Sequence, residues 1–583
     1  MNEENAGPMQ PEAEQPEAPK QETPPEQAQE PKKAGGISKW ILIAGGGLLL
    51  LLAVAIVAGF LIFRALFSGN DPIAAVVPND SLIYMSVDLI ETQSEDFNHF
   101  INILQGISEE KQQTSVEALD EMLQDELGLS FTADILPWVG RHASATITEG
   151  DLSSGDVKFM LIVEATNQGN ADEFITKFVA ALEDRQGESF SQSEKDGVTL
   201  YVSGAGPDTM AIARSGKFLY LANSEDTILK SISLKKSDSL SNSESYKATL
   251  EALPKDRLSA VYINGKMYQD LFDSMSGSMS IYQTSQMGMI EHIDALGFSA
   301  TVTNTGLQMD FVGRFNPEEL TAFEKEALSL TYLPLTADEL VPANTFFFLG
   351  ANTAKSVASL DQTGNPLYSD DVQESFDLFE QQYGISLKEL LGVLGGEFAV
   401  AIAPASDGLL NQGSNTNLGF TVIASALDEQ GFVNWAEHVL DVASEQMGTP
   451  LERKSASFGK YELKEASIQE TMALVYGADQ GYIFLGSSSD MLRDGLNNEK
   501  SLASDETYLN TWKAFDSGSI PYMYLDMQGL MDLIAENADD YGMSDATDIR
   551  DKLKEIPVIA MAWNESPEYT RNATMIIFIQ DQK

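Results

Sequence analysis

The pattern of apolar and polar positions divides the chain into three regions. Residues 1–38 are rich in proline, glutamate and glutamine and contain no apolar period. Such a segment cannot bury enough surface to offset its conformational entropy, so we expect it to be disordered. Ile41–Phe63 follows as an unbroken apolar run. From Asp71 onward, short β-type runs alternate with stretches of helical period, which is typical of a folded body.

The run Ile41–Phe63 has the length and composition of a transmembrane helix. It holds 23 residues and no charge. At ~1.5 Å per residue its helix would be roughly 34 Å long, enough to cross a ~30 Å hydrocarbon core. Lysines at positions 32, 33 and 39 precede the run and Arg64 follows it, so the positive-inside rule predicts a cytoplasmic N-terminus. A cleaved signal peptide is the alternative, but no A-x-A site follows the run.

The body predicts strands that are joined directly by turns. Runs of β-branched and aromatic residues predict strands at Ile83–Val87, Ala143–Ile147, Phe159–Val163, Val198–Val202, Met210–Ala213, Phe218–Leu221, Ser259–Ile263, Phe298–Thr303 and Leu307–Val312. Helical periods predict helices at Asp96–Gln105, Val116–Leu127, Ala171–Leu182 and Asp226–Ile232. Turn sequences such as TNTG favour antiparallel pairing, so we expect an α+β fold with the helices packed on one face of each sheet.

The body also contains an internal repeat. VPNDSLIYMSVD at 77–88 matches VPANTFFFLGAN at 341–352, and LSAVYIN at 258–264 matches IPYMYLD at 520–526. Further matched segments keep the same order, with offsets between 256 and 264 residues. A constant order and spacing is the signature of duplication. We therefore predict two homologous units, 72–318 and 336–583, joined by a helical connector over 319–335 and preceded by a signal anchor over 39–66.

Charge and cysteine content exclude several classes of function. The net charge is −52, from 88 acidic and 36 basic residues, so nucleic acid is a poor partner because phosphate binding needs clustered lysine and arginine. The chain has no cysteine. Disulfides, thiol catalysis, cysteine-ligated zinc and a lipoprotein anchor are thereby excluded, and the body must be stabilised by its core.

Candidate catalytic and metal-binding residues are sparse. The four histidines are His99, His142, His292 and His438, and no two are spaced for a metal site on a helix. His142 lies in a repeated segment in which the second unit has Phe398, which favours a packing role. Nucleophile-elbow, phosphate-loop, dinucleotide and calcium-loop motifs are lacking in a supporting context. We therefore assign no catalytic residue, no metal ligand and no cofactor.

One polar position recurs after the apolar strands. Asp88, Asn264, Asn352 and Asp526 each end an apolar run that begins near a proline. A short side-chain acceptor at this place is what a helix N-cap requires, because it accepts from the free N–H groups of the first turn. A polar or cation site at the strand ends is the alternative interpretation.

Three motifs carry a resemblance to a known family. They are VPNDSLIYMSVD, the segment LGLSFTADILPWVG at 127–140, and ALGFSATVTNTGL at 295–307. Together with the proline-rich tail and the apolar run, this pattern resembles the bacterial DUF3352 family of membrane-anchored proteins. The resemblance implies no catalytic residue. In the second unit the opening motif is altered and the Pro-Trp pair becomes Val393-Leu394.

These observations together predict a single-pass plasma-membrane protein with an extracytoplasmic body. The lipid bilayer is its expected partner through Ile41–Phe63, beside an unidentified extracytoplasmic protein or ligand. A binding or envelope-assembly role is the expectation. The alternatives are a hydrolase that acts on envelope polymers and a sensor that signals through the membrane helix into the tail.

Overall fold

The computed structural model describes the folded body and not the N-terminal region. The described residues are 71–88, 115–151, 156–187, 189–204, 209–267, 269, 292–407, 417–468, 472–497, 500–536 and 546–579. The run Ile41–Phe63 and the helix predicted at Asp96–Gln105 lie outside these ranges. Within the ranges, no helix is long and apolar enough to cross a bilayer.

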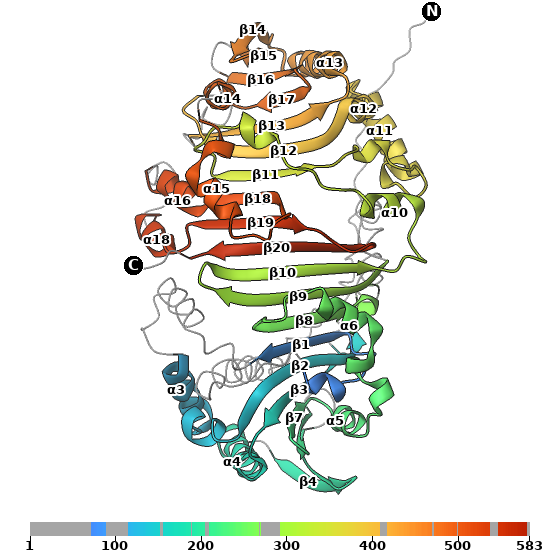
Figure 1. Cartoon of the computed structure of the whole chain (residues 1–583), viewed down its shortest axis with the longest axis vertical. Coiled ribbons are helices and arrows are strands. Elements are labelled where there is room, and N and C mark those ends of the chain that lie inside the picture. Colours follow the sequence, from blue (N-terminus) through green and yellow to red (C-terminus); the bar gives the residue numbers. More distant parts are fainter. Residues whose placement is uncertain are drawn as a thin grey trace, which may run out of the picture.

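Twenty strands form one continuous antiparallel sheet that runs the length of the molecule (Figure 1). In space the order is β4-β5-β6-β7-β3-β2-β1-β8-β9-β10 and then β20-β19-β18-β11-β12-β13-β17-β16-β15-β14. The α+β class and the antiparallel pairing expected from the turn sequences are confirmed. Each unit was expected to have its own sheet, whereas the strands of both form a single one.

The bounds of the strands and helices follow the chain in two series. In the first series they are β1 (Ile83–Asp88), α3 (Ser115–Leu127), β2 (Val139–Asp151), β3 (Asp156–Ala165), α4 (Gln168–Gln186), β4 (Phe190–Lys195), β5 (Val198–Ser203), β6 (Met210–Ser215), β7 (Phe218–Ala222), α5 (Glu225–Ile232), α6 (Glu244–Glu251), β8 (Ser259–Asn264), β9 (Ile293–Thr303) and β10 (Gly306–Phe315). The second series comprises α10 (Ala322–Leu328), β11 (Phe347–Asn352), α11 (Asp370–Tyr383), α12 (Leu387–Val393), β12 (Leu394–Pro404), β13 (Leu418–Ala426), α13 (Glu429–Met447), β14 (Glu452–Phe458), β15 (Tyr461–Ile468), β16 (Met472–Asp479), β17 (Tyr482–Gly486), α14 (Ser489–Leu496), α15 (Glu506–Trp512), β18 (Ile520–Asp526), α16 (Met527–Glu536), α18 (Ala546–Leu553), β19 (Val558–Asn564) and β20 (Thr570–Phe578).

From the outer edge inward, the two halves of the sheet have the same strand order. The first half follows β4-β5-β6-β7-β3-β2-β1-β8-β9-β10, and the second half follows β14-β15-β16-β17-β13-β12-β11-β18-β19-β20. The register agrees as well: β1 and β8 pair Tyr84 with Tyr262, and β11 and β18 pair Phe348 with Tyr524. The two series of strands meet where β10 pairs with β20, in the middle of the sheet (Figure 1). At the centre of this pair, Asp310 lies opposite Thr574.

Helices cover both faces of the sheet, which corrects the expectation of helices on one face. On β6, Ile212 packs into a core cluster with α3 and α4, whereas Ala211 and Ala213 pack into a cluster with α5 and α6. The physical reason lies in the strand sequences. The run Met160–Val163 of β3 is buried at every position, and a strand that is apolar on both sides needs cover on both.

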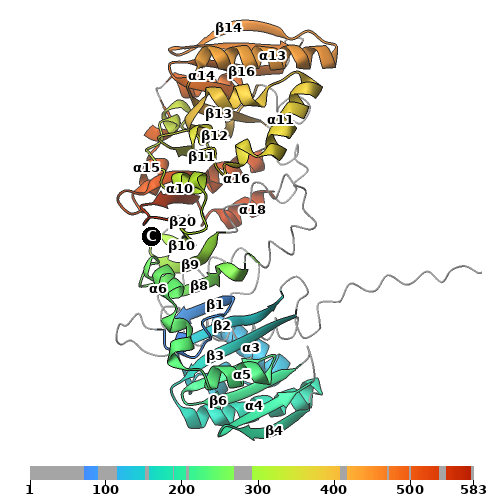
Figure 2. The same ribbon diagram turned by 90° about the vertical axis from the view of Figure 1, so that its right-hand side faces the viewer.

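The second half of the sheet is likewise covered on both faces. One cluster joins the sheet to α13 through Phe432, Ala436 and Leu440, and another joins it to α14 and α15 through residues such as Leu492 and Tyr508. Figure 2 shows α6 and α15 on one side of the sheet and α3, α16 and α18 on the other.

A short helix lies inside the segment expected to connect two units. In α10 the Thr321 side chain accepts from the backbone of Glu324, and the Glu324 side chain accepts from the Thr321 N–H, which forms a capping box. This arrangement satisfies free donors at the helix start. The chain then reaches β11 by way of the 3-10 helix Ala337–Leu340.

Candidate functional site

The four polar positions singled out at strand ends do not come together. Asp88 ends β1 and Asn264 ends β8. Because these strands are antiparallel neighbours, the two residues lie at opposite ends of the strand pair. Asn352 and Asp526 end β11 and β18, which are also antiparallel neighbours. The strands β8, β9, β10, β20 and β19 separate β1 from β18.

Each of the four side chains has its own local partner. Asp526 Oδ1 accepts from the N–H of Gly529 at 2.9 Å in the first turn of α16, the hydrogen bond of an N-cap. Asn264 Oδ1 accepts from the N–H of Lys266 at 3.0 Å. Asn352 Nδ2 donates to the carbonyl of Pro334 at 2.8 Å. Asp88 instead forms an ion pair with a side chain of β2.

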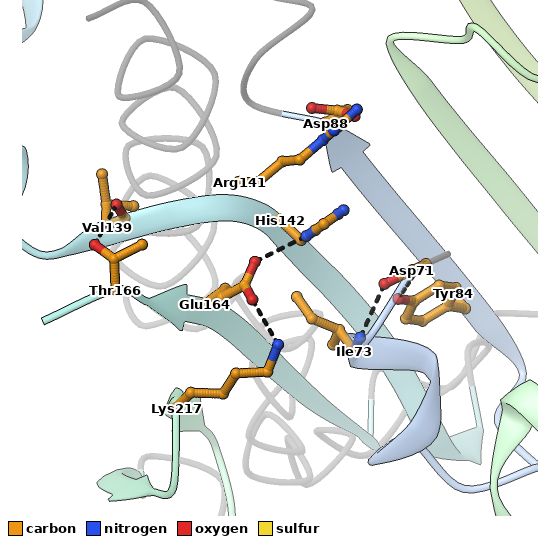
Figure 3. A network of polar contacts seen from close by, with 10 residues as sticks. All are labelled: Asp71, Ile73, Tyr84, Asp88, Val139, Arg141, His142, Glu164, Thr166 and Lys217. Atoms are coloured by element: carbon orange, nitrogen blue, oxygen red, sulfur yellow. Dashed lines mark hydrogen bonds and ion pairs between the residues drawn. The ribbon is translucent and has the colours of Figure 1, made fainter. Parts of the chain in front are cut away.

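The partner of Asp88 is Arg141, which the sequence analysis did not single out. Arg141 Nε donates to Asp88 Oδ2 at 2.7 Å, and its terminal nitrogen also contacts that oxygen (Figure 3). Both side chains are only partly exposed. An arginine and an aspartate that hold each other in this way connect the end of β1 to β2.

A second charged group lies next to this pair on β2, β3 and the turn before β7. His142 Nδ1 lies 2.8 Å from Glu164 Oε2, and Lys217 Nζ donates to Glu164 Oε1 at 2.6 Å (Figure 3). The hydrogen bond with His142 and the nearby Lys217 lower the pKa of Glu164 to about 2. Glu164 is therefore a carboxylate at neutral pH, which can accept hydrogen bonds but has no proton to donate.

The position equivalent to His142 in the second half is Glu397, and the earlier assignment of Phe398 is wrong by one residue. His142 lies opposite Asp88 in the β1–β2 pair, and Glu397 lies opposite Asn352 in the β11–β12 pair. The sequence match missed this because the matched segments 127–147 and 383–402 differ in length by one residue, so an offset counted from their starts is wrong at this position. Glu397 Oε1 accepts from the N–H groups of Thr336 and Ala337 at 2.6 and 2.9 Å.

Each half of the sheet also has a half-buried carboxyl group that is hydrogen-bonded to a core tyrosine. Tyr84 donates its hydroxyl to Asp71, whose other oxygen accepts from the N–H of Ile73 at 2.9 Å (Figure 3). Desolvation raises the pKa of Asp71. In the second half Tyr508 donates to Asp338 Oδ2 at 3.2 Å, and burial raises the pKa of Asp338 to about 6.

These polar groups differ from a metal centre. Across the described ranges, no three His, Cys, Asp or Glu side chains are grouped so that they could hold a metal ion. The charged groups of Figure 3 instead bond the ends of neighbouring strands to one another.

A hollow of about 440 Å³ lies beside the end of β10. Its wall is formed by α6, by Arg314 and Phe315, and by the turn between β19 and β20 with Glu568 and Tyr569. None of the four predicted strand-end residues lines it.

The most extensive feature of the central strands is an apolar face. Residues that pair across an antiparallel sheet point to the same side, so the face can be followed from strand to strand through the registers. We call it the apolar sheet face, and it consists of Leu296, Phe298, Ala300, Val302, Leu307, Met309, Phe311, Ala573, Met575, Ile577, Ile559, Met561, Trp563, Met523, Leu525, Phe347, Leu349 and Ala351.

The apolar sheet face lies between two core clusters and belongs to neither. The cluster under α3 and α4 covers the same side of the sheet at one end, and the cluster under α13 covers it at the other. Ala573 is buried, whereas the remaining side chains of the apolar sheet face are half-buried. On the next strand Phe398 continues the face and is 47% exposed. Helix α16 packs against β19 at one margin.

The opposite side of the same strands is polar only on parts of β9, β10 and β20, and on β11, β18 and β19 it carries buried core residues such as Phe348, Tyr524 and Ala560. Asp310 and Thr574 lie in the polar part, and Ser299 and Gln308 point their side chains at Asp310. Asp310, Thr574 and Ser299 are buried, so the opposite side belongs to the interior of the body. The half-buried apolar sheet face is the side of the central strands that can still bury further apolar area against an apolar molecule. The sequence held part of the signal, since β9 and most of β10 alternate apolar and polar residues, whereas β19 (VIAMAWN) is apolar on both sides.

Comparisons with known proteins give a family and no activity. The sequence matches none of the curated proteins with which it was compared. Among solved structures, crystal forms I and III of TP0453 are similar to part of the chain at 10% sequence identity, with TM-scores of 0.23 and 0.24. They cover 45% and 46% of this chain and 88% and 90% of TP0453. A family match spans residues 43–578, and the chain therefore belongs to DUF3352, a family described as proteins of unknown function.

Proposed function

We propose that this chain is a single-pass envelope protein that binds a partner molecule with its extracytoplasmic body. Residues 1–38 lie in the cytoplasm, Ile41–Phe63 crosses the plasma membrane, and the body follows outside. The body consists of tandem units at 72–318 and 336–583 with a connector at 319–335. It acts as a binding or assembly protein of the envelope.

The repeated strand order supports the tandem units. Ten strands in each series follow one another in the same order, and the matched positions Tyr262 and Tyr524 pair with matched partners. Two unrelated domains would have no reason to agree in both order and register. The α10 helix lies at the expected boundary.

The single observation that carries a binding role is the apolar sheet face. Soluble monomeric proteins rarely expose contiguous apolar patches larger than a few hundred Å², and larger ones mark interaction sites. The apolar sheet face extends over six adjacent strands, from β9 to β11. Its half-buried side chains leave room for a partner to remove further apolar area from water.

The membrane topology is tested by protease treatment of intact cells. An epitope tag at each end of the chain reports which end survives. We expect the C-terminal tag to be lost and a short membrane fragment with the N-terminal tag to remain, because only the body is outside. Lysed cells provide the control, in which both tags are lost. Protection of the C-terminal tag in intact cells would overturn the proposal.

A further inference from the structure

We propose that the apolar sheet face holds the acyl chains of a membrane lipid. The inference rests on the proposed membrane tether, and it adds the chemical class of the ligand. The composition of the face, the state of its backbone and the short tether between the body and the bilayer support it.

Four methionines form a row across the middle of the face. Met309 pairs with Met575, Met575 with Met561, and Met561 with Met523, so the row crosses β10, β20, β19 and β18. Methionine is unbranched and polarizable, and it adapts to apolar ligands that have no fixed shape. An acyl chain is a ligand of this kind.

The row is longer than the methionines alone. It continues from Met309 to Ala300 on β9, and from Met523 to Leu349 and Val400 on β11 and β12. Strands lie ~4.8 Å apart, so these seven positions span roughly 29 Å. Aromatic residues flank it on one side, where Phe298 and Phe311 meet edge to face at 5.4 Å.

The backbone of the face favours an acyl chain over an extended peptide. The strands β9, β10, β20, β19, β18 and β11 each have a neighbour on both sides. Their N–H and C=O groups are therefore engaged in the sheet. An extended peptide would bring backbone groups that need partners, whereas an acyl chain needs only apolar contact.

The bilayer is close to the start of the body. Seven residues separate Phe63, the last residue of the apolar run, from Asp71, the first described residue of the body. At ~3.5 Å per residue they reach at most about 25 Å. Membrane lipid is thus the apolar molecule present at the highest concentration near the body. The net charge of −52 disfavours anionic headgroups, so we expect zwitterionic lipids to bind.

The test uses the full chain in vesicles of phosphatidylcholine that carries a photoreactive diazirine in one acyl chain. After illumination, labelled peptides are identified by mass spectrometry. We expect label in Ile41–Phe63 and also in the strands that carry Met309 and Met575. Label in Ile41–Phe63 alone overturns the lipid site and leaves the tether. Label in the strands alone overturns the tether, and no label in either overturns both.

Two double variants sharpen the result. M309Q/M575Q replaces the methionines by a polar side chain of similar size, and M309L/M575L keeps them apolar. Burying an amide without a hydrogen-bond partner costs at least ~1–2 kcal/mol, so we expect roughly tenfold less label in the strands of the Gln variant. The Leu variant should label like the natural chain. Label in Ile41–Phe63 is the internal standard, and equal strand label in both variants contradicts the proposal.

If residues of this chain or a second copy cover the face, the strands stay unlabelled while the run Ile41–Phe63 is labelled. That outcome overturns the lipid proposal. It is distinguished from misfolding because it is read in the natural chain.

Discussion

Thr574 Oγ1 donates a hydrogen bond to Asp310 Oδ1 at 2.6 Å, and the two residues lie opposite each other in the strand pair that joins the two series of strands. They are 264 residues apart, the same offset that relates Val77–Asp88 to Val341–Asn352. Burial raises the pKa of Asp310. Side-chain donors from Gln308 complete its surroundings at 3.1 Å.

Removing this hydrogen bond should destabilise the body. In the T574V variant the shape is kept but Asp310 loses a buried donor, so we expect the free energy of unfolding to fall by about 1–2 kcal/mol. Denaturant titration of the full chain in one detergent measures it. The matched control is T301V, because the Thr301 hydroxyl is buried without a hydrogen-bond partner. T301V should change stability by less than ~0.5 kcal/mol, and equal losses would contradict the role assigned to Thr574.

The pairing of β10 with β20 should hold the halves together after the chain is cut. A protease site inserted at the exposed Glu318 lies between β10 and α10. We expect the two pieces to elute together after cleavage, because the strand pair and its apolar contacts remain. In a T574D variant two carboxyl groups face each other at the centre, so less of the cut protein should stay together. T305D, in the exposed turn after β9, is the control. If the two pieces separate after cleavage without the T574D substitution, the prediction is contradicted.

Stability should depend on Asp338 in a defined pH range. Burial raises the pKa of Asp338 from 3.8 to about 6 in the folded chain. The folded state therefore binds the proton more tightly, and this contribution is full below about pH 4 and lost as the pH rises through about 6. D338N cannot ionise. Relative to that variant, the free energy of unfolding of the natural chain should fall by roughly 2–3 kcal/mol between pH 4 and 7.

Thermal or denaturant unfolding at several pH values measures the effect of D338N. The exposed residue Asp494 supplies the control, since D494N removes a carboxyl group at the surface. D494N should change the free energy of unfolding by less than ~0.5 kcal/mol, because the Asp494 side chain is exposed. If the difference in the free energy of unfolding between D338N and the natural chain does not change with pH, Asp338 has the same pKa in the folded and unfolded chains, and the prediction is wrong.

Glu164 should stabilise the chain with the opposite pH dependence. Its pKa falls from 4.5 to about 2, first through the hydrogen bond with His142. This contribution is present above pH 4.5 and is lost as the pH falls through about 2. E164Q should cost about 1 kcal/mol at pH 7, because the site is partly open to water. E173Q, which affects an exposed pair with Lys177, should cost less than ~0.5 kcal/mol.

The difference in the free energy of unfolding between E164Q and the natural chain should become smaller as the pH is lowered from 6 to 3. Unfolding midpoints in urea at each pH provide the measurement. If E164Q lowers the free energy of unfolding equally at pH 6 and pH 3, Glu164 acts through its shape and not through its charge.

The strands were readable from the sequence where they are apolar. All nine predicted strands of the first half are present, and Val198–Val202 and Ser259–Ile263 agree with β5 and β8 to within a residue. The strand β4 was missed because Phe190–Lys195 is polar and lies at the outer edge of the sheet, where charged side chains are common. Local composition identifies a strand only if the strand is at least half buried.

Relationships between strands were harder to predict. The pairing of β10 with β20 joins residues 264 positions apart, and no turn sequence indicates it. The ion pair of Asp88 with Arg141 likewise depends on the β1–β2 register. The apolar sheet face emerges only after the registers of six strands are combined, because strands such as β19 (VIAMAWN) and β11 (FFLGAN) show no alternation of their own.

The Asp310–Thr574 pair has a consequence for the history of the chain. A symmetric dimer of one ancestral half, joined through this strand, would place the same residue opposite itself on the twofold axis. Two aspartates there would repel each other, and two threonines would leave no carboxylate to accept a hydrogen bond. Once both copies belong to one polypeptide, the two positions can mutate independently. Two different residues can thus face each other at the axis in a single fused chain, but not in a homodimer.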